Sequence, residues 1–136
     1  MGIGRLKMAW FAPLDLHSHL TWLRLVVAFV WLTFGLLFKA LGAVPRHRQI
    51  VARVVGIDRA AAVLWLVATA ETGLGLWMLA GRFLPWCVGA QTLFILTMNT
   101  LELRHARDLL LSPVGMVCAN VVFLSVGWYV AWGMPR

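Results

Sequence analysis

One long apolar segment, Ala60 to Gly81, constrains what this chain can fold into more than any other feature. Its length matches the roughly 20 apolar residues that an α-helix needs to cross a bilayer. Glu71 is its only charged residue, and at 1.5 Å per residue its carboxyl lies roughly 16 Å deep. A carboxylate facing lipid at that depth costs at least about 2.5 kcal/mol. We therefore expect Glu71 to face the interior of a bundle, and to find a donor there or stay protonated.

The composition of the whole chain is that of a membrane protein. Of its 136 residues, 62% are hydrophobic and 12% are charged, and the charged fraction is about half that of a soluble domain. A net charge of +7 suggests nucleic acid in a soluble protein. Here the lysines and arginines lie in short segments and at the ends of apolar runs, where membrane orientation and anionic lipid explain them. We predict one membrane domain, residues 1–136, and no nucleic-acid partner.

Four apolar runs predict four membrane-spanning helices, at about residues 21–42, 60–81, 84–103 and 112–132. The expected fold class is an all-α integral membrane protein, a four-transmembrane-helix up-down bundle. Residues 1–20 mix charges, aromatics and Pro13, which is typical of an interfacial segment. In the longest loop, Gln49 to Val55 predicts a short helix lying in the interface.

Four spans place both termini on one side of the membrane, side A, and the first and third loops on side B. Side B holds seven lysines and arginines and side A holds five. This small excess favours side B as the cytoplasmic side.

Polar residues from all four predicted spans are expected to converge on one region of the bundle, because polar groups avoid lipid. Measured along the helices, they descend from side B toward the acid in the second span, and one cation approaches from side A. Two interpretations stand: a cavity open to water or ligand, or hydrogen bonds that join the helices at about 0.6–2 kcal/mol each. The candidate pocket residues are Glu71, Arg24, Lys39, Asn99, Glu102 and Asn120.

The expected pairing within this pocket follows from depth and side-chain reach. Lys39 and Glu102 have opposite charge and similar depth, so we expect them to approach each other at the side B rim. Arg24 is the preferred cation for Glu71, since its side chain is long and its guanidinium is the less strongly hydrated cation. Glu71 is also expected to bond to an amide or hydroxyl, with the candidates Asn120, Asn99 and Thr92.

Metal, haem and thiol chemistry have little support in the sequence. Cys87 and Cys118 lie on different predicted spans and form no CxxC pair. His17 and His19 lack the further ligands of a metal site, and no histidine lies within a span to hold haem. We predict no catalytic residue and no metal ligand.

Three predicted spans share a pattern of polar residues and glycines. The first contains Arg24, Gly35 and Lys39, the second contains Glu71 followed by glycines, and the fourth opens Ser112-Pro113-Val114-Gly115 and contains Asn120. Over about residues 20–127 this pattern resembles the DoxX-like family of small four-helix bacterial membrane proteins. The resemblance implies the bacterial cytoplasmic membrane. The resemblance also implies that the chain has relatives with known roles. Some of these relatives are subunits of a thiosulfate:quinone oxidoreductase, and others are maturation proteins of methylamine dehydrogenase. The redox-thiol arrangement of some relatives is missing here.

Three functions remain open at this stage. The leading hypothesis is a non-catalytic subunit or accessory protein of a membrane complex, with an internal polar pocket around Glu71. A redox or quinone-linked complex is one candidate for that complex. The second is a stand-alone binder or enzyme acting on a quinone, a lipid or a sterol-like molecule. The third is an oligomeric transporter or proton path. The expected partners are the bilayer and other membrane subunits or copies of the chain, and a quinone or lipid is the only bound cofactor expected.

Overall fold

The computed structural model describes residues 18–40, 42 and 45–134, and over these residues every regular element is helical. Residues 1–17 of the interfacial segment expected at residues 1–20 lie outside the described residues. The elements in chain order are α2 (His19–Leu32), η1 (Thr33–Ala40), α3 (Pro45–Val55), α4 (Ile57–Ala80), α5 (Leu84–His105), η2 (Arg107–Leu109) and α6 (Pro113–Gly133).

Within the described residues, three helical segments are long and apolar enough to cross a membrane: His19–Leu37, Ile57–Ala80 and Pro113–Gly133. They coincide with the first, second and fourth predicted spans. The third predicted span forms α5, which has 22 residues but is not one of these three segments. It carries Gln91, Asn99 and Glu102, which lower its hydropathy. The described chain is thus all-helical with three candidate spans and five α-helices, which does not confirm a four-helix bundle.

Local sequence chemistry explains where the long helices begin and end. The Ser112 side chain accepts a hydrogen bond of 3.1 Å from the Gly115 backbone N–H and so caps α6, with Pro113 in the first turn. Gly81 ends α4 with a φ of 71°, in the left-handed region that glycine adopts without strain. The predicted boundaries at residues 81, 84, 112 and 132 hold to within one residue.

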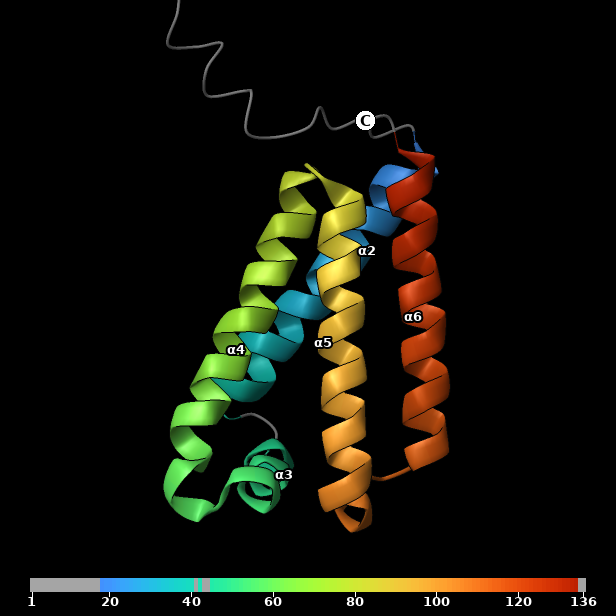
Figure 1. The fold of residues 1–136 in the computed structure, drawn as a ribbon. Helices are drawn as coiled ribbons and strands as arrows, with labels where there is room; N and C mark the ends of the chain where they lie inside the picture. The colour runs from blue at the N-terminus through green and yellow to red at the C-terminus, as the bar shows by residue number, and fades with distance from the viewer. Residues whose placement is uncertain (1–17, 41, 43–44, 135–136) are drawn as a thin grey trace, which may run out of the picture.

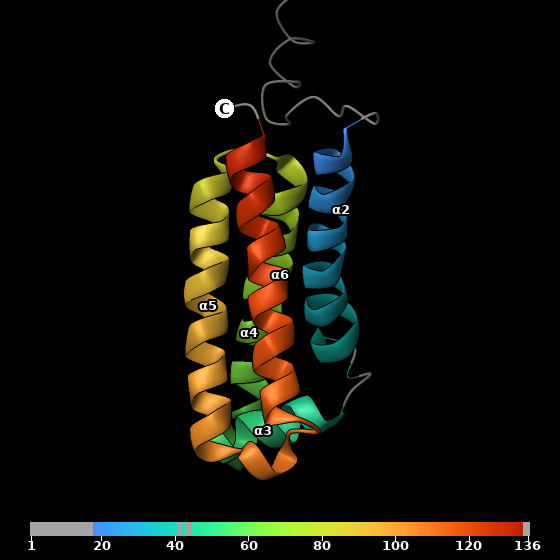
Figure 2. The same ribbon diagram turned by 90° about the vertical axis from the view of Figure 1, so that its right-hand side faces the viewer.

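The four long helices form a ring in which α2 and α5 each pack against both α4 and α6. The start of α2 and the end of α6 lie at the same end of the ring (Figure 1). The short helix α3 lies across the opposite end, which we call the α3 end (Figure 2). There α3 packs against α4, α5, η1 and η2. The loop helix expected at Gln49 to Val55 therefore exists, and it begins earlier, at Pro45.

The first span departs from the uninterrupted α-helix expected over residues 21–42. Its α-helix ends at Leu32, and Thr33–Ala40 forms the π-helix η1. The α2–η1 segment crosses the bundle obliquely, since α2 packs against both α4 and α6, whereas η1 packs chiefly on α4 (Figure 1). Gly35 permits the close approach of η1 to α4, as a Cβ there would lie 2.6 Å from Thr72 Oγ1. The space between η1 and α6 therefore widens toward the α3 end.

The buried apolar core lies mainly in the half of the bundle away from α3. It draws residues from all four long helices: Val27, Ala28, Trp31, Met78, Leu84, Cys87, Val88, Ile95, Val130 and Ala131. This half is filled by side chains, and the half at the α3 end is where the structure leaves a cavity.

Candidate functional site

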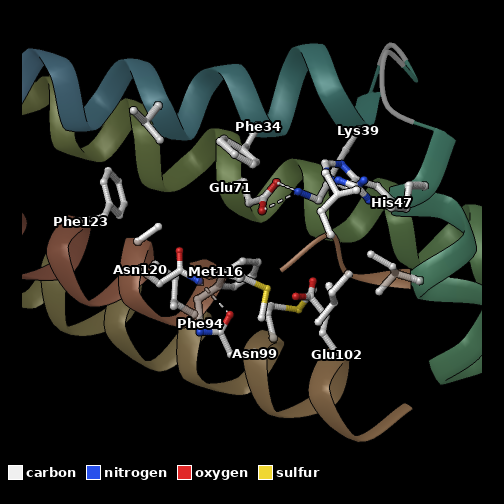
Figure 3. Close-up of a pocket in the computed structure, with 18 of the residues that line it drawn as sticks. Phe34, Lys39, His47, Glu71, Phe94, Asn99, Glu102, Met116, Asn120 and Phe123 are labelled. Carbon is white, nitrogen blue, oxygen red and sulfur yellow. Dashed lines mark hydrogen bonds and ion pairs between the residues drawn. The ribbon is translucent and has the colours of Figure 1, made fainter. Parts of the chain in front are cut away.

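A cavity of about 670 Å³ occupies the α3 end of the bundle. Its volume falls within the roughly 300–1,000 Å³ typical of small-molecule sites. Side chains from η1, α5 and α6 form its walls and α3 closes its end (Figure 3). Most of the lining is apolar or aromatic, including Trp31, Phe34, Phe94, Phe123, Met98 and Met116.

A buried ion pair sits in the cavity wall. Lys39 Nζ lies 2.9 Å from both carboxyl oxygens of Glu71, and the two side chains are only 9% and 8% exposed. Lys39 comes from η1 and Glu71 from the middle of α4, so the pair joins two neighbouring elements (Figure 3). Lys39 Nζ also lies 5.4 Å from the centre of the Phe34 ring. This pair gives Glu71 Oε1 a hydrogen-bond donor and Glu71 an opposite charge while the residue stays buried.

Glu102 lines the same cavity from α5, and its carboxyl points into the cavity across from the Lys39–Glu71 pair (Figure 3). It lies close enough to Lys39 and Glu71 for both charges to act on it. Among the described residues, however, it has no hydrogen-bond or ion-pair partner. The expected approach of Lys39 and Glu102 is confirmed, because both line this cavity and the charge of Lys39 acts on Glu102. The direct ion pair of Lys39, however, is with Glu71.

Two asparagines bridge the helices beside the ion pair. Asn120 Nδ2 on α6 donates a hydrogen bond of 2.9 Å to Asn99 Oδ1 on α5, and both residues line the cavity. Neither amide bonds to Glu71, and Thr92 instead accepts a hydrogen bond from Trp128 Nε1. The expectation that Glu71 bonds to Asn120, Asn99 or Thr92 is wrong.

Arg24 is the one candidate pocket residue that does not line the cavity. It lies in α2 and is fully buried, with no hydrogen-bond partner for its guanidinium nitrogens among the described residues. The expected contact between Arg24 and Glu71 is therefore wrong. The reason is geometric: Arg24 is fifteen residues before Lys39, and it is Lys39, in η1, that reaches Glu71. A π turn also holds more residues than an α turn, so Lys39 advances less far toward the rim than its position in the sequence suggests.

His47 is a cavity residue that the sequence reasoning missed. It comes from α3 and stacks on Phe34 with ring centres 6.3 Å apart. Burial, with Lys39 and then Arg46 nearby, lowers its pKa to about 4, so the imidazole is neutral at pH 7. The signal was available: His47, Ile50 and Val51 recur at helical spacing, and the two apolar residues are buried.

We predict that protein stability falls as the pH drops from 6.5 to 4, and falls less in His47→Gln. The unfolded imidazole has a pKa near 6.5 and the folded one about 4, so the unfolded state binds more protons in this window. The stability that the neutral form provides is present above pH 6.5 and is lost as the pH falls. Thermal unfolding in detergent measures it. His105→Gln, at an exposed position, should follow wild type, and a His47→Gln profile identical to wild type would contradict the prediction.

The helix α3 is fastened over the end of the cavity by a surface ion pair. Arg53 Nη1 and Nη2 each donate a hydrogen bond of 2.9 Å to the Asp108 carboxyl, and these two bonds join α3 to η2. The hydrogen bonds from Arg53 lower the pKa of Asp108. Both side chains are at least half exposed, so solvent screens the pair, which fixes the position of α3 more than it adds stability.

Among residues 18–40, 42 and 45–134, no three histidine, cysteine or acidic side chains gather in a geometry that could hold a metal. Cys87 is buried on α5 and Cys118 is exposed on α6, and neither forms a disulfide. The polar groups of this site are thus one ion pair, one further carboxyl, two amides, a neutral imidazole, the Arg46 guanidinium and the Ser112 hydroxyl.

A family model described as "DoxX-like family" matches residues 28–128. No curated protein and no solved structure matches the chain. The matched range includes the ion pair, Glu102, both asparagines and His47.

Proposed function

Because this chain belongs to the DoxX-like family, whose model matches residues 28–128, we propose that it is a membrane protein that binds a lipophilic small molecule with a polar head. The proposed site is the cavity at the α3 end. The observation that carries the proposal is the 670 Å³ cavity whose apolar walls surround a small set of buried polar groups. Ligand sites commonly combine these two features.

The size of the cavity argues against a purely structural role for its polar residues. This volume is many times what a single water molecule requires. Hydrogen bonds that only hold helices together, such as the bond from Asn120 to Asn99, need no such space. A volume of this size with aromatic walls suits an occupant with an apolar body.

The proposed access route is lateral, from the bilayer, between η1 and α6. The cavity is lined on one side by Phe34 of η1 and on the other by Met116 and Ala119 of α6. Phe34 is 41% exposed, and η1 packs on α2, α3 and α4. A lipophilic molecule dissolved in the membrane reaches such an opening without crossing water.

We propose further that the protein is a non-catalytic accessory subunit of a membrane complex, with a lipid or a quinone as candidate occupants. Support comes from the described residues, most of which form the bundle itself. The test is purification from native membranes in mild detergent. A stoichiometric partner protein supports the accessory role, and a chain that purifies alone while retaining its small molecule contradicts it.

In this proposal α5 also crosses the bacterial cytoplasmic membrane, which gives four spans and places both termini on one side. Its 22 residues are long enough, and its polar residues Asn99 and Glu102 face the cavity instead of lipid. Single cysteines at Arg82 and Leu111, in a Cys87→Ser/Cys118→Ser background, should react with a membrane-impermeant maleimide from opposite sides. Labelling of both from the same side would overturn the four-span arrangement.

The binding proposal predicts that filling the cavity expels its occupant. Ala119→Trp places a large side chain in the cavity, and Val122→Trp places the same side chain on the exposed face of α6. Mass spectrometry of extracts from purified protein should detect a small molecule with wild type and with Val122→Trp. Its amount should be at least fivefold lower with Ala119→Trp. Equal amounts in both variants, or no copurifying molecule at all, would contradict the proposal.

A further inference from the structure

We propose that the head group bound in this cavity is a protonated amine, and that Glu102 is the residue that selects it. This inference rests on the proposed binding function and specifies the chemical class of the ligand. It is carried by the arrangement of charges around the cavity.

The three charged groups that act on one another inside the cavity do not balance. Lys39 directs its ammonium at both carboxyl oxygens of Glu71, at 2.9 Å each. The charges of Lys39 and Glu71 act on Glu102, but Glu102 forms an ion pair with neither. No other described residue donates a hydrogen bond to it. The group of three carries one excess negative charge when both carboxyls are ionised. A single positive charge placed beside Glu102 would neutralise it.

The remaining ionisable residues of the lining form no ion pair or hydrogen bond with Glu102 among the described residues. They are Arg46 and His47, both on α3, at the closed end of the cavity. Arg46 acts electrostatically on His47, whereas the charges that act on Glu102 are those of Lys39 and Glu71. His47 is neutral near pH 7. The α6 wall contributes no charged side chain to the lining.

The walls of the cavity favour a cation in a second way. Aromatic rings attract cations through their faces, by about 0.5–2 kcal/mol depending on desolvation. Four aromatic residues line this cavity: Trp31, Phe34, Phe94 and Phe123. Phe34 already makes such a cation–π contact with Lys39, whose Nζ lies 5.4 Å from the ring centre. An amphiphilic amine would place its ammonium at Glu102 and its apolar chain along these rings.

Other head groups fit this site less well. A quinone presents only hydrogen-bond acceptors, and an unpaired carboxylate requires a donor. A fatty acid would bring a further negative charge against Glu102 in an apolar setting, which is unfavourable. An alcohol can donate to Glu102 but leaves the excess charge in place.

The test compares three probes with the same chain: dodecylamine, dodecanol and dodecanoate. Each is titrated at pH 7 into the purified protein in phosphatidylcholine nanodiscs, and binding to empty nanodiscs is subtracted. We expect wild type to bind dodecylamine at least tenfold more tightly than dodecanol, and dodecanoate most weakly. This selectivity is measured on wild type and needs no variant to fold.

Two variants then assign the selectivity to one residue. Glu102→Gln preserves the size of the side chain and removes its charge, and should weaken dodecylamine binding at least tenfold while changing dodecanol binding less than twofold. Asp58→Asn removes one negative charge from an exposed position near the same end and should bind all three probes as wild type does.

The outcomes separate this inference from the proposed function. No probe binding above empty nanodiscs contradicts the binding function itself. Equal binding of amine and alcohol by wild type leaves the cavity as a binding site but overturns the amine assignment, as does preference for dodecanoate. An unchanged amine affinity in Glu102→Gln overturns the role of Glu102.

Discussion

Gly35→Ala is expected to destabilise the protein by about 2–3 kcal/mol or more, because the new Cβ has no space beside α4. It would lie 2.6 Å from Thr72 Oγ1, 2.8 Å from Thr72 N and 2.9 Å from Ala68 O. Two of these three atoms are backbone atoms of α4, which cannot rotate away. The strain is relieved only if η1 moves off α4, and that movement also separates Lys39 from Glu71.

The matched control is Gly73→Ala, on the same helix α4 as the residues that Gly35 contacts. A Cβ at Gly73 meets nothing within 4 Å, and alanine is better than glycine in a helix by up to about 1 kcal/mol. This variant should be as stable as wild type or more stable. Loss of helical circular dichroism on heating in detergent measures both. Equal stability of Gly35→Ala and Gly73→Ala would mean that the close contact between η1 and α4 is absent.

Breaking the Lys39–Glu71 pair is expected to have the second large effect. Each single variant, Lys39→Met or Glu71→Leu, leaves one charged group buried without its partner, at a cost of about 3–5 kcal/mol. The double variant removes both charges and should recover most of that loss, because an apolar pair of similar volume fits an apolar bundle. The coupling energy comes from the four proteins unfolded side by side in a double-mutant cycle.

A surface pair provides the contrast for this cycle. Arg53 and Asp108 form an ion pair with the same 2.9 Å separation, but both side chains are at least half exposed. Their coupling should be much smaller than that of the buried pair, because solvent screens exposed charges. If the Lys39 and Glu71 variants behave like wild type, Glu71 is no anchor of the fold, and the interpretation of this chain as built around a buried acid is wrong.

The sequence by itself determined the features that depend on local chemistry and on exclusion from lipid. Gly81 marks the C-terminal end of α4, and the Ser112 cap marks the start of α6. Both signals are readable from the sequence because they act within one helical turn. The buried position of Glu71 also followed from sequence, since any lipid-facing carboxylate at that depth is costly. The family was recognisable from the same residues, and the match over residues 28–128 confirms it.

Only the tertiary structure decided which polar groups meet. Counting residues at 1.5 Å each gives depth along a straight helix, but it gives neither the tilt of one helix across another nor the direction of a side chain. The sequence reasoning therefore chose Arg24 for Glu71, whereas the oblique α2–η1 segment brings Lys39 there. It also could not know that η1 would be a π-helix.

The cavity and its glycines depend on the same long-range geometry. The space opens because η1 leans on α4 and away from α6, and α3 then brings His47 over its end. Gly73 and Gly75 looked alike in sequence, yet a Cβ meets atoms only at Gly75, where Leu32 Cγ would lie 2.8 Å away. Close contacts between helices are set by residues distant in the chain, so no local pattern can distinguish the glycine at a helix contact from one that faces outward.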